Sequence, residues 1–437
     1  DEVGREVAVR GYRRFWRVPG FDGMDQEPAD WAGCVDRSVA HLLAPARDEV
    51  EEYERDDPRS AWTAFEDSVT GMRGRIVYPA LHHTTFIMVF LAYAERWPDR
   101  TAASAARRQA VEYGGWLLDH SLPADWRCGG LAPSTVDHGE VGGGVEGESI
   151  TLFRQARAAE AYLLLAGGTG DARFTAGAER VAAVLLDLQR DDGSWPFRVD
   201  PRTGDTTEDY TSASIGPIRL FRLLEDTGVG SAADRAAWRE ARVRAEHWLL
   251  AGPISDGRWE GMYEDIPGLP AWSNLQNWDT NETIRYLCSD GCDLPDRIDH
   301  ARRLNAYIED QFVVWAAEDS PVGVRCLTPS VLEQYRCFWP MEVHTGHWLM
   351  SLLALHHATG EKHYLSKGVA AANAIAAGQV ENGALSTWGF DRRFGTTPMP
   401  VNWPGCNAFA AHALLRWQEY YDAVASGRDY RLGSLGL

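Results

Sequence analysis

One internal repeat strongly limits what this chain can fold into. The stretch "TGDARFTAGAERVAAVLLDLQRDDGSW", which begins at Thr169, aligns without a gap with "TGEKHYLSKGVAAANAIAAGQVENGAL", which begins at Thr359, 190 positions later. Both copies contain a Thr-Gly loop, an acidic residue, an aromatic residue, a helical pattern ending in Gln, and a turn with Gly. Another helical pattern precedes each copy, at 150–166 and 348–358. The repeating unit is therefore a helical hairpin closed by a Gly-containing turn.

Helical periodicity extends this pattern over most of the chain. Apolar residues in 174–188 recur at steps of four and three, which is one face of an amphipathic helix. The segments 85–97, 348–360 and 408–421 are apolar on nearly all sides, which predicts inner, buried helices. We therefore predict an all-α fold with few short strands: an (α/α) toroid or barrel of about six helical hairpins. Residues 1–437 would form one toroid domain, with 1–60 as an N-terminal extension packing on it.

The charge and the cysteines exclude several classes of function. The chain has 63 acidic and 43 basic residues, a formal charge of −20, which repels nucleic acid and anionic membranes. No apolar run approaches the ~20 residues of a membrane span. Seven cysteines are scattered without a CxxC set, so we expect buried free thiols, no metal site and no cofactor. We expect a protein that is cytoplasmic, or secreted with its signal removed. Its oligomeric state stays open.

The hairpin sequences resemble a known group of enzymes. The stretch 146–197, with its "TGD-x-R-Phe" start and its Gly193-Ser194-Trp195-Pro196 turn, is similar to the repeats of six-hairpin carbohydrate-active enzymes, the (α/α) toroid glycoside hydrolases and polysaccharide lyases. Within that group it is most similar to the pectic-acid lyases. The resemblance is one of scaffold, so it implies no catalytic residues here. The "DGSW" turn also resembles turns of squalene-hopene-type cyclases, but their Asp-x-Asp-Asp cluster has no match in this chain.

The segment "SNLQNWDTNETIRYL" (273–287) is the strongest candidate site. Asp279 and Glu282 are three residues apart and share one face if a helix begins near Trp278. A carboxylate pair can divide acid and base roles. The alternative is a capping box with Asp279 as N-cap. Nearby Asn and Trp residues favour a site, since a cap does not require them.

Three further junctions between loop and helix mix polar and aromatic residues. In "DHGEVGGGVEGESITLF" (137–153), acids and His alternate with Gly, and the alternative is a flexible acidic loop. In 330–350, His344 and His347 are three apart, and the alternative is satisfied histidines inside a helical bundle. The stretches 78–86, 206–218 and 387–409 carry similar residues, which caps and packing aromatics would also explain.

The recurrence of these clusters ahead of inner helices favours a shared sugar cleft, because indole rings and short polar groups suit a sugar. The predicted catalytic residues are Asp279, Glu148, Asp209, His344 and Tyr335. The predicted substrate-binding residues are His82, His83, His138, Glu146, Tyr210, Trp272, Asn274, Asn277, Trp278, Glu282, Arg336, Trp339, His347, Trp388 and Trp403.

The function that we expect is cleavage of glycosidic bonds in a poly- or oligosaccharide. A glycoside hydrolase with a carboxylate acid/base pair, Asp279 with Glu148 or Asp209, is favoured. A polysaccharide lyase would instead use a His or Tyr base for β-elimination on a uronate glycan. A terpenoid-type cyclase and a non-catalytic glycan-binding toroid remain as alternatives. An aromatic cavity would suit the cyclase, although the sequence has no clear DDxxD-type pattern.

Overall fold

The computed structural model is predominantly helical, with twelve α-helices and short strands among the residues it describes. It describes residues 26–44, 66–67, 78–134, 136–137, 140–141, 149–209, 214–257, 259, 275–317, 324–334, 337–394 and 401–432. The chain divides into two compact units. Unit 1 comprises 1–41, 258–402 and 409–437, and unit 2 comprises 42–257 and 403–408.

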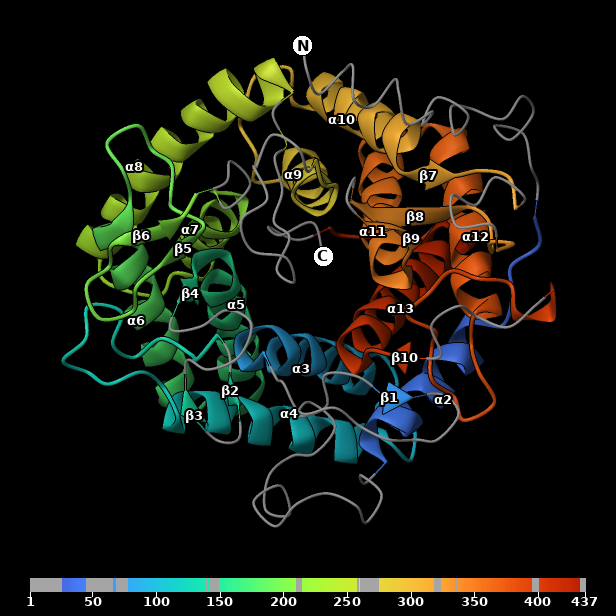
Figure 1. Cartoon of the computed structure of the whole chain (residues 1–437), viewed down its shortest axis with the longest axis horizontal. Helices are drawn as coiled ribbons and strands as arrows, with labels where there is room; N and C mark the ends of the chain where they lie inside the picture. The colour runs from blue at the N-terminus through green and yellow to red at the C-terminus, as the bar shows by residue number, and fades with distance from the viewer. Residues whose placement is uncertain are drawn as a thin grey trace. The chain divides into compact units, whose positions relative to one another are not determined.

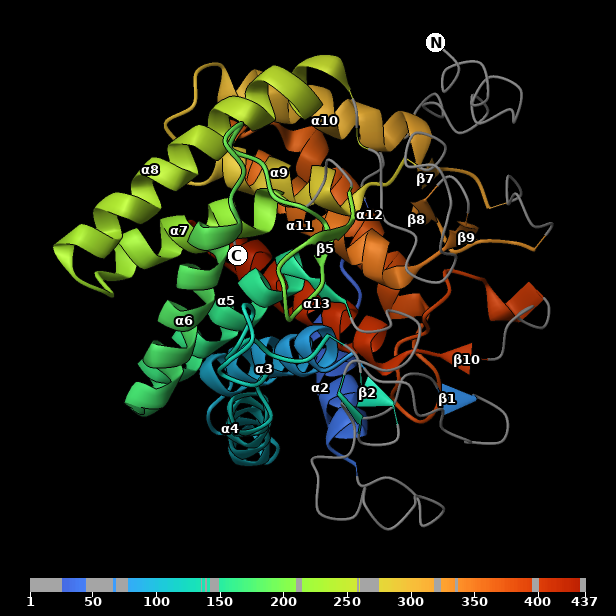
Figure 2. The same ribbon diagram turned by 60° about the vertical axis from the view of Figure 1, so that its left-hand side comes forward.

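The described helices of unit 2 that follow residue 44 pair into three helical hairpins (Figure 1). They pair α3 (Pro79–Arg96) with α4 (Ala103–Asp119), α5 (Leu152–Thr169) with α6 (Ala172–Leu188), and α7 (Ile215–Thr227) with α8 (Ala232–Leu249). Helices α3, α5 and α7 contact one another in sequence, while α4, α6 and α8 lie on their outer side (Figure 2). The inner helices are therefore buried on most sides, as predicted for α3 from 85–97.

The strands of unit 2 are short and lie between the hairpins. Antiparallel β4 (Ile150–Thr151), β5 (Arg198–Val199) and β6 (Thr206–Glu208) form one sheet. A second antiparallel pair joins β2 (Val136–Asp137) to β3 (Glu140–Val141). The unit also holds β1 (Glu66–Asp67) and η5 (Leu250–Ile254), a π-helical continuation of α8.

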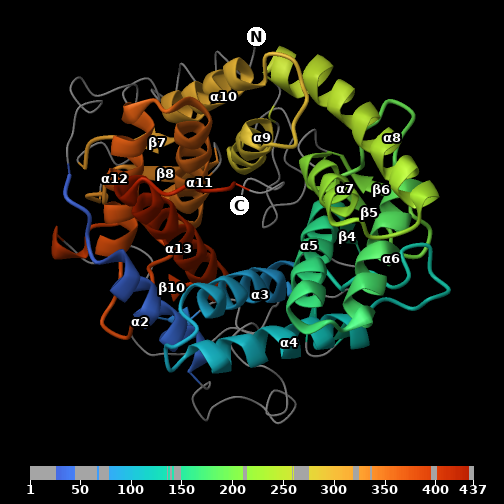
Figure 3. The ribbon, with the colours of Figure 1, turned by 180° about the vertical axis from the view of Figure 1, so that it is seen from behind.

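Unit 1 repeats the hairpin plan (Figure 3). Helix α9 (Trp278–Cys288) pairs with α10 (Arg297–Gln311), and α11 (Glu342–Thr359) pairs with α12 (Lys362–Ala377). The third helix pair combines segments that are far apart in the sequence: α2 (Trp31–Leu43) packs on α13 (Pro404–Ser426). The Trp31 ring lies 5.4 Å from that of Tyr421 and 6.5 Å from that of Trp417, between ring centroids. The described part of the predicted 1–60 extension thus includes an outer helix of unit 1.

A small sheet in unit 1 connects its first two hairpins. Strands β7 (Val313–Val314), β8 (Ser330–Gln334) and β9 (Cys337–Pro340) pair antiparallel, with an irregular register between Leu332 and Gln334. The unit also holds η7 (Arg392–Phe394) and β10 (Val401–Asn402).

The predicted repeat is confirmed at the level of single hydrogen bonds. Gln189 Nε2 donates to Gly193 O at 3.0 Å and to Ala241 O of α8 at 2.8 Å. Gln379 Nε2 donates to Gly383 O at 2.9 Å and to Cys34 O of α2 at 2.8 Å. In each hairpin turn, one glutamine amide therefore donates both to a carbonyl of its own turn and to a carbonyl of the neighbouring outer helix.

The two turn glycines are also equivalent. Gly193 has φ +94° and Gly383 has φ +93°, values that favour glycine. A Cβ at Gly193 would lie 2.5 Å from Arg244 O, and a Cβ at Gly383 would lie 2.6 Å from Arg37 O. These turns need glycine both for their backbone conformation and for close packing on the neighbouring helix.

Two further predictions concern residues that the structure describes. The six cysteines with described side chains are thiols outside any disulfide, and five of them are buried, as the sequence predicted. No helix in the described part of the chain combines the length and apolar character needed to cross a membrane.

Candidate functional site

Several of the predicted site residues meet where α9, β8 and α11 come together in unit 1. Asn277, the residue before α9, is fully buried and ties these elements together. Its Nδ2 donates to Leu332 O at 2.8 Å and to Glu333 O at 2.7 Å, both on β8. Its Oδ1 lies 3.1 Å from Nδ1 of His344 in the first turn of α11. One side chain thus connects all three elements.

The local backbone explains why one amide reaches two successive carbonyls. In a regular strand, neighbouring carbonyl groups point to opposite sides. The register of β8 shifts between Leu332 and Gln334, so the strand is irregular at this point. An isolated bridge from Gln334 to Gln276 then places the start of α9 beside the same irregularity.

His344 is held in a neutral state by its surroundings. It is 7% exposed, and burial lowers its pKa from the usual value to about 3. Its hydrogen bond within the described residues uses Nδ1. A neutral imidazole has one ring nitrogen with a lone pair, which is the protonation state that a general base requires. The burial that keeps His344 neutral also makes it a weaker base than a solvated histidine.

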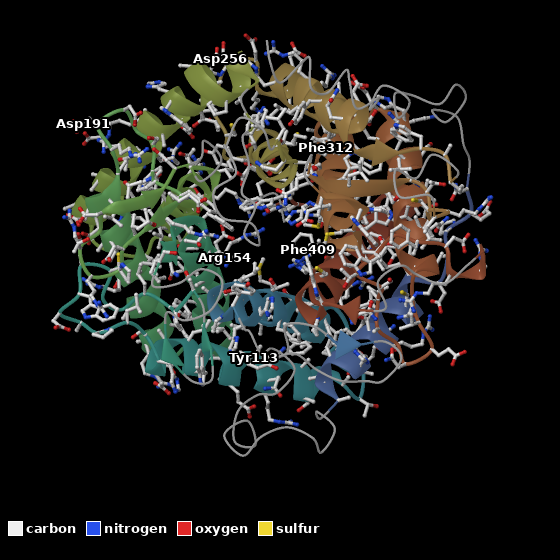
Figure 4. All side chains as sticks on the ribbon, in the orientation of Figure 1. Tyr113, Arg154, Asp191, Asp256, Phe312 and Phe409 are labelled. Atoms are coloured by element: carbon white, nitrogen blue, oxygen red, sulfur yellow. The ribbon has the colours of Figure 1, made fainter. Side chains whose placement is uncertain are left out.

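His347 lies one helical turn after His344, and the two ring centroids are 6.2 Å apart. Its Nδ1 is 3.6 Å from Glu282 Oε1, and Glu282 is also paired with Arg285. Its ring stacks on Phe409 of α13, labelled in Figure 4, with centroids 3.9 Å apart. These contacts hold the imidazole in place between a carboxylate and an aromatic face.

The ring of Trp278 lies nearly parallel to that of His347, with centroids 6.3 Å apart and an interplanar angle of 16°. Trp278 is the first residue of α9. The predicted mixture of indole and imidazole groups is therefore present at this junction.

Asp279 is buried at the start of α9 and is held by Gln276. Gln276 Nε2 donates to Asp279 Oδ2 at 3.2 Å, and the Asp279 backbone N–H donates to Gln276 Oε1 at 3.1 Å. Helix α9 begins at Trp278, so Asp279 lies inside its first turn. The capping-box alternative is wrong here, because Asn277 occupies the N-cap position and Glu282 pairs with Arg285.

The other predicted aromatic residues of unit 1 form a separate cluster close to the start of α11. The Trp339 ring lies 5.3 Å from Trp388 and 5.4 Å from Phe390, between centroids. Trp388 is buried, whereas Trp339 is partly exposed. Trp339 therefore has an accessible aromatic surface and is packed against Trp388 and Phe390.

The predicted residues of unit 2 have different environments. His83 lies against Trp116 and Tyr113 of α4, each with centroids 5.0 Å away, and burial lowers its pKa well below the usual value. These contacts place His83 in the core of its own hairpin. His82 has an edge contact with Tyr78, with centroids 5.8 Å apart, while Trp403, just before α13, is partly exposed.

Asp209 is on the surface of unit 2. Its side chain is 55% exposed and accepts two hydrogen bonds from Arg190, at 3.0 and 2.9 Å. A solvated carboxylate in an ion pair is a weak candidate for a catalytic acid, which needs burial to stay protonated. The remaining predicted residues lie outside the described part of the chain: His138, Glu146, Glu148, Tyr210, Trp272, Asn274, Tyr335 and Arg336.

Sequence reasoning missed some residues of this site, among them Arg285 and Phe409. Arg285 lies three residues after Glu282 on α9, and this helical spacing was visible in the sequence. Phe409 contacts His347 from α13, and no local pattern links residues so far apart. Within the described residues, no group of three or more His, Cys, Asp or Glu side chains is placed to hold a metal ion.

Comparison with known proteins identifies the fold. No protein-family model matches the chain, and no curated protein matches its sequence. A D-mannose isomerase structure matches with a TM-score of 0.65 and 12% identity, covering 92% of this chain and 100% of its own. A cellobiose 2-epimerase from Spirochaeta thermophila matches with a TM-score of 0.60 and 14% identity, covering 91% and 100%.

A family 76 glycoside hydrolase from a bovine Bacteroides thetaiotaomicron strain matches with a TM-score of 0.60 and 10% identity, covering 90% of this chain and 78% of its own. These structures confirm the predicted fold class, the (α/α) toroid of helical hairpins. At such low identity, they establish the fold and leave the reaction to be argued from the site.

Proposed function

We propose that this protein is a carbohydrate-active enzyme that moves a proton at a sugar carbon next to a carbonyl group. Its reaction centre is the junction of α9, β8 and α11. The observation that carries this proposal is His344, a buried, neutral imidazole bonded through Nδ1 to Asn277. Structures with the same fold include enzymes named as a sugar isomerase and sugar epimerases, which supports this substrate class.

The proposed reaction starts from the open-chain form of an aldose. Nε2 of His344 takes the proton from C2, and the C–H electron pair forms the C1–C2 double bond of an enediol. The carbonyl oxygen at C1 takes a proton from His347, the second imidazole of the site. Return of a proton to C1, with loss of the proton on O2, gives the ketose.

The positions of the two histidines favour isomerisation over epimerisation. His344 and His347 are three residues apart on α11, so they lie on one side of that helix. A 1,2-isomerisation can run with its proton transfers on one face of the enediol. Epimerisation at C2 needs protons removed and returned on opposite faces, and therefore a further acid outside this pair.

Hydrolysis is the second candidate, and the buried carboxylates of α9 are the observation that favours it. Asp279 and Glu282 are each 2% exposed and lie on adjoining turns of one helix. However, Glu282 is paired with Arg285, and one oxygen of Asp279 is bonded to Gln276. These partners stabilise both groups as carboxylates, whereas a glycosidase needs one protonated acid. The same histidine base would also serve β-elimination on a uronate, the lyase alternative.

Product analysis separates these reactions. The chain would be incubated with D-mannose, cellobiose and mannan oligosaccharides, and the products followed by NMR and reducing-end assay. We expect a ketose from an aldose, with no new reducing ends. New reducing ends from the oligosaccharides would instead establish hydrolysis. An ultraviolet-absorbing unsaturated product from a uronate polymer such as polygalacturonate would establish the lyase.

A further inference from the structure

The orientation of the Asn277 amide is fixed by its surroundings. Its Nδ2 lies 2.8 Å from Leu332 O and 2.7 Å from Glu333 O. Backbone carbonyl oxygens only accept hydrogen bonds, so the nitrogen rather than the oxygen must face them. The side-chain oxygen is consequently the atom that faces His344.

This orientation determines which nitrogen of His344 carries the proton. Asn277 Oδ1 can only accept, so Nδ1 of His344, 3.1 Å away, must donate. A neutral imidazole has one ring proton, and Nε2 is therefore left with its lone pair. The other tautomer would bring two lone pairs face to face inside the protein, at the loss of a buried hydrogen bond.

A second amide supports the same arrangement. Asn281 Nδ2 donates to Asn277 O at 3.0 Å and approaches Asn277 Oδ1 at 3.4 Å. Asn281 Oδ1 in turn accepts from Ser351 Oγ on α11 at 2.7 Å. Ser351 thus donates to the Asn281 amide, and the Asn281 amide donates to the oxygen atoms of Asn277.

We propose that Asn277 is a positioning residue: it holds His344 as the Nδ1–H tautomer, with Nε2 presented as the base. This inference rests on the proposed function for its catalytic meaning, since it names the atom of that site that accepts the substrate proton. Asn277 acts through His344 and also fixes α9 to β8.

The direct test is an NMR measurement that needs no substrate. Two-bond ¹H–¹⁵N correlation spectra of the ¹⁵N-labelled full chain report which histidine nitrogens carry protons, and the His344→Gln variant assigns the His344 signals. We expect a protonated Nδ1 and an unprotonated Nε2 at pH 7. A protonated Nε2, or a signal averaged between the two tautomers, would overturn the proposal.

Variants extend this test to turnover. Asn277→Ala removes the acceptor, and we expect an averaged His344 signal together with a kcat about tenfold lower or more, at a nearly unchanged KM. The matched control is Asn373→Ala. Asn373 also donates twice from Nδ2, to Gln26 Oε1 and Glu27 O, and its Oδ1 accepts from Ala29 N and Trp31 Nε1, so its hydrogen bonds among the described residues involve no histidine. We expect this control to retain the wild-type tautomer and kcat within about twofold.

The proposal about the His344 tautomer and the proposed function can be contradicted separately. If the wild-type chain transforms none of the sugars, the proposed function fails, whereas the tautomer of His344 is still decided by the spectrum. A defined tautomer that persists in Asn277→Ala would contradict the role assigned to Asn277, whatever the reaction is.

Discussion

The two units carry different chemistry at equivalent positions of one repeat. Helix α5 of unit 2 begins at Leu152, and α11 of unit 1 begins 190 positions later, at Glu342, as the repeat requires. Where unit 1 has His344 and His347, unit 2 has Arg154 and Arg157. Arg154, labelled in Figure 4, is fully buried and lies over the ring of Tyr78, 5.1 Å from its centroid. A guanidinium keeps its charge, whereas imidazole can exchange a proton near neutral pH.

The scaffold around these positions is nearly the same in both units. Gln189 and Gln379 make matching pairs of hydrogen bonds, and Thr169 and Thr359 each donate to the carbonyl four residues earlier. The comparison teaches that the turns, which join neighbouring hairpins, are constrained by packing. The first turns of the inner helices α5 and α11 carry different residues in the two units.

The largest expected effect tests the equivalence of the turns. Gly193→Ala and Gly383→Ala should each cost about 3–4 kcal/mol of unfolding free energy, because a Cβ would overlap a backbone carbonyl at positive φ. Urea unfolding would measure both variants. The controls are Gly170→Ala and Gly360→Ala, which have φ +72° and +68° but open space around the added Cβ. They should cost about 1 kcal/mol. Very unequal losses at Gly193 and Gly383 would break the equivalence.

The second prediction concerns a difference between the units. Glu342, the first residue of α11, is fully buried, and neither carboxylate oxygen has a hydrogen-bond partner within the described structure. The equivalent residue of unit 2 is Leu152, also fully buried. Glu342→Leu should therefore stabilise the protein, by about 2 kcal/mol at pH 8.

The pH dependence of that gain has a definite sign. Burial raises the pKa of Glu342 from 4.5 to about 8, so the folded chain keeps a proton that the unfolded chain loses above pH 4.5. Stability from this group is complete below pH 4.5 and is lost as the pH rises toward 8. Denaturation at pH 5 and pH 8 should show a larger advantage of Glu342→Leu at pH 8. An equal advantage at both values would mean that Glu342 is not a buried neutral acid.

The smallest expected effect tests the glutamine side-chain amide that occurs at the same position in both hairpin turns. Gln189→Leu and Gln379→Leu should each destabilise the chain by about 1 kcal/mol, since each loses two hydrogen bonds to backbone carbonyls. Gln418→Leu is a suitable control, because its amide bonds Asp422 one turn away on the same helix, at 2.8 Å. That control should change stability by less than about 0.5 kcal/mol. A loss at only one of the two turns would show that the repeat is not energetically equivalent.

Local sequence patterns predicted the hairpins well. The apolar face of 174–188 became α6, with Phe174, Ala178 and Leu185 buried, because helical periodicity reflects burial directly. The role of α2 was not predictable in the same way. It pairs with α13 from the far end of the chain, and no periodicity records such a long-range partner.

The site was predicted only in part, because local patterns locate single residues but not the contacts between distant ones. Residues that precede or begin helices, such as Asn277 and His344, could be found from their position. The contact between them depends on the irregular register of β8, which the sequence pattern does not reveal. Exposure also separates Asp209 from Asp279, although both are acids near the start of a helix.

The most direct test of the account is exchange of the C2 hydrogen of D-mannose with solvent deuterium, followed by ¹H NMR. We predict exchange with the wild-type chain, and a rate at least about a hundredfold lower with His344→Gln, because a general base contributes that much. Circular dichroism would verify that the variant is folded. Exchange that continues unchanged in a folded His344→Gln variant would contradict the assignment of the base, and the absence of both exchange and ketose with the wild-type chain would contradict the proton-transfer reaction itself.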